Sequence, residues 1–280
     1  MRIAYLGPAG TFTEDALVEA GPAGGFEPLR TATIPDAILA VQAGEADRAL
    51  VPIENSIEGS IRPTLDTLAV EAEAVTIVGE HDYAVRAHLI AREGVELDDV
   101  EAVLSHPQPL AQCARFLREN FAGVELRSVS STAAAVRMVS ESVRPWAAIG
   151  ARTAADLYDC TILREGIQDE ATNVTRFLWI APAGTEPSGG EDGGPWKTSL
   201  VFSELGEDHP GALVNALSEF SSRDINLTRI ESRPLRQELG RYMFFCDLEG
   251  AATDAPIAEA IAQLRIKAES VRLLGSYPAA

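Results

Sequence analysis

Short apolar runs alternate with helical patterns through the first 183 residues, and this alternation restricts the possible fold more than any other feature. Short apolar runs bounded by turn residues are typical of buried strands. Ile34, Ile38 and Val41 show helical spacing instead, and they follow Thr33, which can cap a helix. Strands that alternate with helices favour parallel sheets covered by helices. The sequence therefore predicts an α/β fold, with strands at 2–6, 48–53, 75–80, 83–91, 100–105, 124–129 and 147–150.

A polar segment, GTEPSGGEDGGP, separates this region from the tail of the chain. Residues 184–195 contain five Gly, two Pro and three acidic residues, a composition typical of a flexible linker. The tail reads strand, helix, strand, strand, helix, strand, and this βαββαβ order is ferredoxin-like. Its strands are expected at 197–204, 225–234, 241–250 and 270–277, and its helices are marked by Leu213, Leu217 and Phe220 and by Ile257, Ile261 and Leu264.

Composition and charge exclude several classes of partner. The 280-residue chain is 46% hydrophobic and 23% charged, which is ordinary for a globular protein. Its formal net charge is -19, so we expect no nucleic-acid partner, because phosphate binding needs a basic face. Any anionic substrate must be held by local positive charge, which is feasible because exposed repulsion fades beyond about 8 Å at physiological salt.

The cysteines and the apolar runs point to a reducing, aqueous compartment. Cys113, Cys160 and Cys246 form neither a Cys-x-x-Cys motif nor a cluster with histidine, so we expect no disulfide and no metal site. No run approaches the roughly 18 apolar residues of a membrane span. Residues 1–7 read as a strand and lack the layout of a signal peptide. We therefore predict a cytoplasmic protein without a membrane partner.

Five predicted strands are followed by small, hydroxyl or amide residues at helix starts. One such turn alone is explained by helix capping, but five together suggest a shared polar cleft at the carboxyl ends of the strands. Helix N-termini carry free N–H groups and partial positive charge, which suits carboxylates. The five turns are GPAGTFT (7–13), IENSIEGS (53–60), HPQ (106–108), SSTAAA (130–135) and ARTAA (151–155).

Known cofactor and nucleophile motifs are absent from these turns. The chain has no G-x-G-x-x-G, no G-x-x-x-x-G-K and no G-x-S-x-G, so we expect no nucleotide cofactor and no nucleophile elbow. His106 precedes Pro107, a setting that favours a structural turn over a general base. His81, His88 and His209 show no metal-ligand spacing. The prediction is a site without a cofactor or metal.

A hydroxyl and a cation directly precede a buried strand in the stretch NVTRFLWI (173–180). Arg176 at the start of an apolar run needs a partner, because an unpaired charge there is costly. A structural carboxylate such as Asp169 or Glu54 would serve, and so would an anionic ligand. Thr175 can act as a strand-end cap or contact that ligand.

Taken together, these strings resemble the prephenate dehydratase family. The resemblance rests on GPAGTFTEDAL, VPIENSIEGSI, SHPQPLAQC, STAAA and NVTRF in this order, and on a tail that resembles the regulatory ACT domain. In that tail, HPGALVNAL (209–217) and ESRP (231–234) match two segments of the phenylalanine pocket. Ile57 and Pro109 depart from residues common in the family.

The resemblance implies a fold and domain boundaries. It implies a catalytic domain at 1–183 that is similar to type II periplasmic binding proteins, with lobes at about 1–76 with 165–183 and at 77–164. It also implies the linker at 184–195 and an ACT regulatory domain at 196–280. Subunits of such proteins pair through the ACT domains, so the expectation is a homodimer or homotetramer.

The reaction implied by the resemblance converts prephenate to phenylpyruvate, water and carbon dioxide. Such an enzyme must hold two carboxylates, orient the ring and help the hydroxyl leave. Arg176 would bind a carboxylate, Thr175 would contact the departing hydroxyl, and Glu54 would be either a proton donor or a brace between lobes. The remaining residues of the implied site are Asn55, Ser56, Ser105, Gln108, Thr132 and Phe177.

The resemblance also implies feedback regulation by L-phenylalanine. Its site residues would be Gly211, Ala212, Leu213, Glu231, Ser232, Arg233 and Pro234. Two alternatives remain open from the sequence. The substrate could be arogenate, which carries an amine in place of the ketone, or the chain could be a non-catalytic sensor of aromatic ligands.

Overall fold

The protein is described by a computed structural model that covers residues 1–187, 194–206, 210–235 and 240–280. Most of the predicted linker (188–193), together with His209, lies outside the described residues. The chain divides into two compact units, which we call the first and second units. The first comprises Met1–Ala37, Leu50–Ile61 and Asp82–Phe177, and the second comprises Ile38–Ala49, Arg62–His81 and Leu178–Ala280. The domain boundaries implied by the family resemblance stay a prediction.

Two sheets confirm the predicted two-lobed α/β architecture. The strands β2-β1-β3-β11-β5 belong to a larger sheet that continues from β5 to β15 (Ser270–Pro278) of the tail, and β8-β7-β9-β6-β10 form a separate sheet. The first five strands are β1 (Arg2–Leu6), β2 (Glu27–Thr31), β3 (Arg48–Asn55), β5 (Val75–Ala84) and β11 (Val174–Pro182). The strands of the separate sheet are β6 (His88–Arg92), β7 (Ala102–Ser105), β8 (Glu125–Ser128), β9 (Trp146–Gly150) and β10 (Cys160–Arg164).

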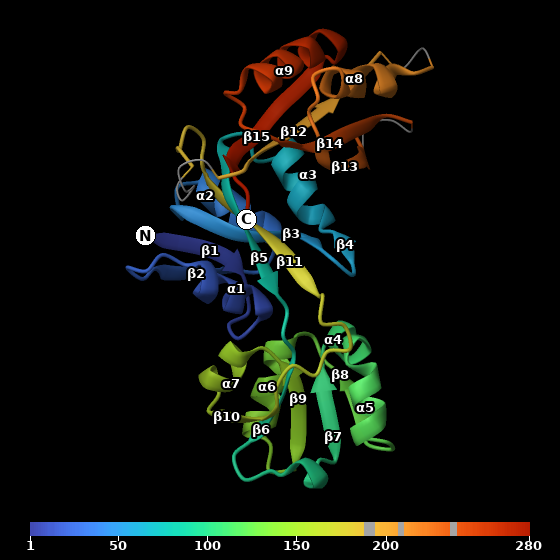
Figure 1. Ribbon diagram of the computed structural model, residues 1–280. Coiled ribbons are helices and arrows are strands. Elements are labelled where there is room, and N and C mark those ends of the chain that lie inside the picture. The colour runs from blue at the N-terminus through green and yellow to red at the C-terminus, as the bar shows by residue number, and fades with distance from the viewer. Residues whose placement is uncertain (188–193, 207–209, 236–239) are drawn as a thin grey trace. The chain divides into compact units, whose positions relative to one another are not determined.

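In the sheet β8-β7-β9-β6-β10, the central strands β7, β9 and β6 are buried on both faces because they are apolar at consecutive positions, whereas the edge strands β8 and β10 are more exposed. Leu89, Val103 and Ile149 pack against Leu117 of α5 on one face. The residues between them contact α6 and α7 on the other face, as in Ile90, Leu104 and Ala148. Figure 1 shows these helices flanking the sheet. The helices of this region are α4 (Pro107–Gln112), α5 (Ala114–Asn120), α6 (Thr132–Glu141) and α7 (Arg152–Leu157).

Strand pairing is mixed rather than wholly parallel. Strand β7 is parallel to both β8 and β9, as the alternation of strands and helices predicted. Strand β6 instead runs antiparallel to β9 and β10. Between β5 and β6 the structure differs from the predicted strands at 75–80 and 83–91, because β5 continues to Ala84 and β6 begins only at His88.

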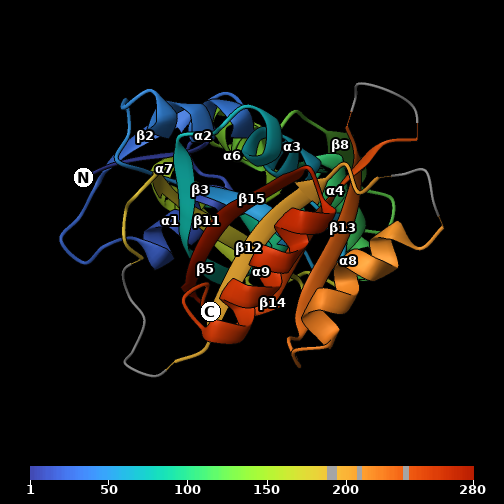
Figure 2. The ribbon, with the colours of Figure 1, turned by 90° about the horizontal axis from the view of Figure 1, so that it is seen from above.

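The tail folds as the predicted βαββαβ unit. Its strand order is β13-β14-β12-β15, and β12 pairs antiparallel with both β14 and β15. Helices α8 and α9 lie on the same side of this sheet (Figure 2). The elements are β12 (Trp196–Ser203), α8 (Ala212–Ser221), β13 (Leu227–Pro234), β14 (Tyr242–Glu249), α9 (Ala255–Lys267) and β15 (Ser270–Pro278).

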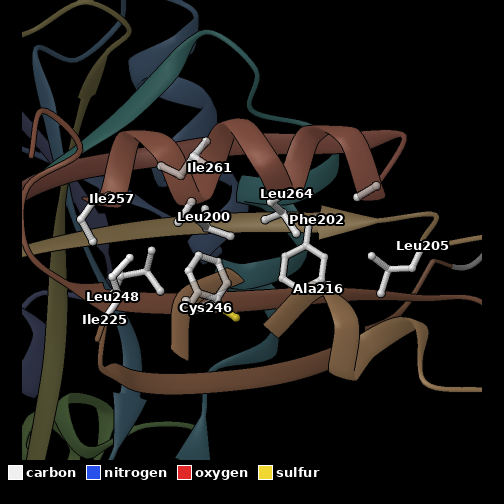
Figure 3. Packing of buried hydrophobic residues seen from close by; sticks show 13 residues of the cluster. Leu200, Phe202, Leu205, Ala216, Ile225, Cys246, Leu248, Ile257, Ile261 and Leu264 are labelled. Atoms are coloured by element: carbon white, nitrogen blue, oxygen red, sulfur yellow. The ribbon is translucent and has the colours of Figure 1, made fainter. Parts of the chain in front are cut away.

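The tail's core is formed by alternate residues of its strands and one stripe of each helix. Figure 3 shows Ile257 and Leu264 of α9 directed towards the strands, and both belong to one buried cluster with Ile261, Leu200 and Phe202. A spacing of three and four residues places the α9 side chains on one helical face, as the sequence predicted. The opposite face of this sheet is more polar, and there Ser199 donates a hydrogen bond to Asp247.

Within the second unit, helix α3 (Arg62–Val70) is bound by two arginines from the tail. Arg233 of β13 donates from Nε and Nη2 to the two carboxylate oxygens of Asp66, at 3.0 and 2.8 Å. Arg272 of β15 donates to backbone carbonyls at the end of the helix, including those of Leu68 and Ala72. The cation beside the helix C-terminus also suits the helix dipole.

The short elements α1 (Phe12–Ala20), α2 (Ile34–Gln42), β4 (Gly59–Ser60) and a 3-10 turn (Leu97–Asp99) complete the fold.

Candidate active site

Strands β3 and β11 present their side chains alternately to two faces of the sheet. Asn55 of β3 contacts Thr175 of β11 on one face, and Glu54 contacts Arg176 on the other. This follows from the two-residue period of a strand, which sends neighbouring side chains to opposite sides. Although Thr175 and Arg176 are adjacent in sequence, their side chains therefore lie on opposite faces of the sheet and contact different residues.

The Asn55 side chain is fixed by backbone N–H groups on one side. Its Oδ1 accepts hydrogen bonds from the N–H groups of Ile57 and Glu58, each at 3.0 Å. The amide nitrogen must therefore face the other way, and its Nδ2 donates to Thr175 Oγ1 at 2.9 Å. Because Thr175 Oγ1 accepts this bond, the hydroxyl keeps its own proton for another acceptor.

Ser56 ties the same turn to the start of β11. Its Oγ donates to the carbonyl of Thr172 at 2.9 Å and accepts from the N–H of Val174 at 3.0 Å. The backbone N–H of Ser56 donates to the Val174 carbonyl. The turn after β3 and the residues around Thr175 thus form one hydrogen-bonded assembly within the first unit.

On the opposite face, Arg176 lies between two carboxylates. Its Nε donates to Asp82 Oδ1 at 3.1 Å, and its Nη1 lies 3.7 Å from Glu54 Oε2. These side chains line a cavity of about 360 Å³ together with Ser56 and Val174. The ion-pair alternative to ligand binding is therefore present in the structure, with Asp82 and Glu54 as the partners.

Asp169, the other partner considered for Arg176, caps helix α5. Its carboxylate accepts hydrogen bonds from the N–H groups of Arg115 and Phe116, at 2.9 and 3.4 Å. Carboxylates are favoured at helix N-termini because of the free N–H groups and the helix dipole.

The other predicted site residues are distributed more widely. Ser105 is fully buried, and its Oγ donates to the Ile149 carbonyl at 2.8 Å. Thr132 is a buried residue at the start of α6, whereas Gln108 is exposed at the start of α4. Phe177 is buried and packs edge-on against Tyr83, with ring centroids 6.4 Å apart. The structure thus brings Asn55 into direct contact with Thr175, and Ser56 into contact with Thr172 and Val174. The hydrogen bonds above do not reach Ser105.

His106 has the structural role that its neighbour Pro107 suggested. It is the N-cap of α4, and its Nδ1 accepts a hydrogen bond from the backbone N–H of Gln108 at 3.3 Å.

Three of the five strand-end turns lie close together. Gly10 has φ of 78°, and a Cβ at this position would be 3.0 Å from Ala154 Cα and 3.5 Å from Ala133 Cβ. The turn after β1 therefore packs on the starts of α6 and α7 through a residue that must be glycine. Asp15 reinforces this contact, because its Oδ1 accepts from the N–H of Thr153 at 3.0 Å.

Sequence reasoning missed Asp15, Asp82, Tyr83 and Asn173. Burial and the nearby Asp15 carboxylate raise the pKa of Tyr83, so its hydroxyl stays protonated and donates to Asp15 at 3.1 Å. Asp82 also lines a second cavity of about 410 Å³, together with Asp15 and Tyr83. Asp82 lies in a polar stretch between two predicted strands, and its sequence context carries no signal. Asn173, by contrast, stands in the NVTRF motif and could have been selected.

Two family models together match most of this chain. The family model for prephenate dehydratase matches residues 3–185, and the model for the ACT domain matches residues 204–266. The chain belongs to the prephenate dehydratase family. A prephenate dehydratase of Mycolicibacterium smegmatis is 43% identical over 288 residues, which cover 99% of this chain and 90% of that protein.

Solved structures show the same architecture. The prephenate dehydratase of Arthrobacter aurescens, solved in complex with L-Phe, is 40% identical with a TM-score of 0.89, and the match covers 99% of this chain and 90% of that one. The structure of GqqA, named as a novel type of quorum quenching acylase, is 31% identical with a TM-score of 0.88. That match covers 100% of this chain and 98% of the other. Architecture alone therefore does not fix the reaction.

Two further observations apply to the described part of this prephenate dehydratase family member. No group of three or more His, Cys, Asp or Glu side chains there is arranged to hold a metal ion. No helix there is long and apolar enough to cross a membrane.

Proposed function

We infer that the protein catalyses the decarboxylative dehydration of prephenate to phenylpyruvate, the step that leads towards L-phenylalanine. Family membership over nearly the whole chain supports the substrate and the reaction class. The single structural observation that carries the mechanism is the hydrogen bond from Asn55 to Thr175, which leaves the threonine proton available.

The chemistry needs one bond broken at each end of the substrate ring. The carbon–carbon bond to the ring carboxylate breaks and releases carbon dioxide, and its electron pair enters the ring. The carbon–oxygen bond to the ring hydroxyl breaks at the opposite end, and the oxygen leaves as water after taking up a proton. The ring becomes aromatic, which drives the reaction. The protein must therefore bind the carboxylates, align the ring and stabilise the departing oxygen.

Thr175 donates its hydroxyl proton in a hydrogen bond to the departing oxygen. A threonine is a weak acid, so this bond stabilises the leaving group in the transition state, and the proton that completes the water comes from the solvent. Asn55 supplies the matching hydrogen bond to Thr175 Oγ1 and thereby directs the proton towards the substrate.

Arg176 binds a carboxylate of the substrate while remaining paired with Asp82. Because Thr175 lies on the other face of the sheet, this role requires the substrate to lie across the start of β11, where both faces are within reach. The Arg176 side chain is 29% exposed, and a guanidinium carries five donors, so a carboxylate of the substrate has access beside Asp82 and Glu54. Glu54 fits the brace better than the proton donor. Its side chain is 37% exposed, and its Oε2 lies 3.7 Å from Nη1 of Arg176, a geometry that suits an ion pair. Five further residues complete the proposed site, and they either orient the substrate or support the residues that orient it: Ser56, Ser105, Gln108, Thr132 and Phe177.

Turnover of prephenate by residue-matched variants tests these roles. Thr175→Val keeps the shape but lacks the hydroxyl, and we expect kcat to fall by about 100- to 1,000-fold, the range for a lost hydrogen bond to a charge that develops in the transition state. Thr175→Ser should retain most of the activity, and Thr185→Val, in an exposed turn, serves as the control. A normal kcat for Thr175→Val would exclude the role of the hydroxyl. A normal kcat and KM for Arg176→Gln would leave Arg176 structural.

The tail acts as a sensor for L-phenylalanine and as the site of subunit pairing. Support comes from the ACT family match and from the related A. aurescens enzyme, whose structure contains L-Phe. The proposed pocket combines Gly211, Ala212 and Leu213 with the 231–234 segment, that is, Glu231, Ser232, Arg233 and Pro234. Val214 and Ile230 are 69% and 49% exposed, which suits a homodimer or homotetramer formed through this part.

Within this assignment, Arg233 contributes indirectly. Its guanidinium is bound to Asp66, so we propose that it fixes the end of β13 beside the effector rather than contacting the effector itself. Regulation then requires that the two states of the enzyme differ in their affinity for phenylalanine.

Activity assays distinguish two alternative functions from the proposed one. Arogenate as the substrate would give phenylalanine directly, and kcat/KM values for arogenate and prephenate distinguish the two. A non-catalytic sensor would bind aromatic ligands and produce no phenylpyruvate.

A cytoplasmic location is also proposed, and it is supported by three free cysteines, which are typical of a reducing compartment.

A further inference from the structure

A row of amide side chains leads away from Thr175 towards helix α4. Asn55 Nδ2 donates to Asn173 Oδ1 at 2.8 Å, and Asn173 Nδ2 donates to Gln112 Oε1 at 3.2 Å. Asn173 is 3% exposed and Asn55 is 7% exposed, so these bonds lie in the interior of the first unit. Buried amides of this kind are costly unless each is paired.

The direction of every bond in this row is set at one end. The backbone N–H groups of Ile57 and Glu58 require Asn55 to present its oxygen to them. Asn55 must then present its nitrogen to Asn173, which accepts with Oδ1. The nitrogen of Asn173 consequently faces Gln112. The row therefore has one orientation rather than two.

The two hydrogens of Asn55 Nδ2 face three acceptors. These are Asn173 Oδ1 at 2.8 Å, Thr175 Oγ1 at 2.9 Å and the Val174 carbonyl at 3.2 Å. If Asn173 binds one hydrogen, the amide is held in the plane that directs the second at Thr175. Without Asn173, the Val174 carbonyl takes its place as the second acceptor, so the amide plane turns towards that carbonyl and the bond to Thr175 loses its alignment.

We propose that Asn173 is a positioning residue for the dehydration, because it holds the Asn55 amide so that the Thr175 hydroxyl directs its proton at the leaving oxygen. The inference rests on the proposed function and adds a residue that touches no reacting atom. It also connects the turn after β3 with α4, the helix that follows β7, through side chains alone.

The first test is Asn173→Ala in the wild type and in Thr175→Val. In the wild type we expect kcat to fall by about ten- to a hundred-fold, the cost of one lost buried hydrogen bond, while KM changes by less than about three-fold. In the Thr175→Val background, the same substitution should cause no further loss of kcat, because the hydroxyl it positions is gone. A residue with a merely structural role would lower kcat by the same factor in both backgrounds.

Asn173→Asp provides a second variant that keeps the acceptor for Asn55. Gln112 Nε2 is buried and has no hydrogen-bond partner among the residues that the structure describes, so the Gln112 amide can turn and donate to the new carboxylate. We expect kcat for this variant to be at least about ten-fold above that of Asn173→Ala. Asn120→Ala, which removes an exposed asparagine bonded to its own helix, is the control and should stay within about two-fold of the wild type.

The outcomes separate this inference from the proposed function. If the wild type does not convert prephenate, the proposed function fails. If the wild type is active but Asn173→Ala keeps its kcat, or Asn173→Asp is no better than Asn173→Ala, the positioning role is overturned.

Discussion

The ion pair between Arg233 and Asp66 gives the sharpest prediction about how the tail is attached to helix α3. Two hydrogen bonds join the partners, and each side chain is only 13% exposed. Exposed pairs contribute up to about 1 kcal/mol, whereas breaking a buried pair costs about 3–5 kcal/mol. Because this bidentate pair is mostly but not fully buried, we expect Arg233→Met to lower the free energy of unfolding by about 2–3 kcal/mol.

A double-mutant cycle with equilibrium urea unfolding measures this contribution. Arg233→Met and Asp66→Leu are compared with the double variant, which should be less destabilised than the sum of the two, with a coupling of about 1.5–2 kcal/mol. Arg2→Met is the matched control, because Arg2 and Glu27 form an exposed pair with 45% and 72% of their side chains accessible. It should change stability by less than about 1 kcal/mol. A loss for Arg233→Met no larger than for Arg2→Met, or strict additivity in the cycle, would refute the reasoning.

Three further predictions concern the tail and one buried histidine. Lys197→Met leaves the Glu80 carboxylate, which is 2% exposed, without this cation, so urea unfolding should show a loss of about 3–5 kcal/mol that Glu80→Leu largely restores. Burial lowers the pKa of His88, so the unfolded chain binds its proton first. Stability should therefore decline as pH falls below about 6.5, and His88→Gln should flatten this decline in thermal unfolding between pH 5 and 8. Gly211, the residue before α8, has φ of 90°, and Gly211→Val should weaken L-phenylalanine binding in calorimetry, whereas absence of binding by the wild type would contradict the sensor.

Sequence patterns predicted the parts of the fold in which one local signal dominates. The apolar run at 2–6 became β1, and the helical spacing from Ile257 to Leu264 became α9. Strand β2 was missed because it is largely exposed at Glu27–Thr31 and lacks an apolar run. The break between β5 and β6 was misplaced because apolar residues continue through it.

In the candidate site, the sequence identified residues but not their partners. The motif around Thr175 and Arg176 marked both residues, and the two-residue period of a strand would already have placed them on opposite faces. The partner Asp82 could not be predicted, because the pairing of β5, β11 and β3 depends on tertiary contacts that no local pattern encodes. The role of Asn173 likewise depends on Asn55, which is 118 residues away in sequence.

Incubation of the purified protein with prephenate tests the central claim most directly. We predict that phenylpyruvate forms with release of carbon dioxide, and that Thr175→Val abolishes most of this turnover while Thr175→Ser retains it. Failure of the wild type to form phenylpyruvate would contradict the account, even if the protein binds L-phenylalanine.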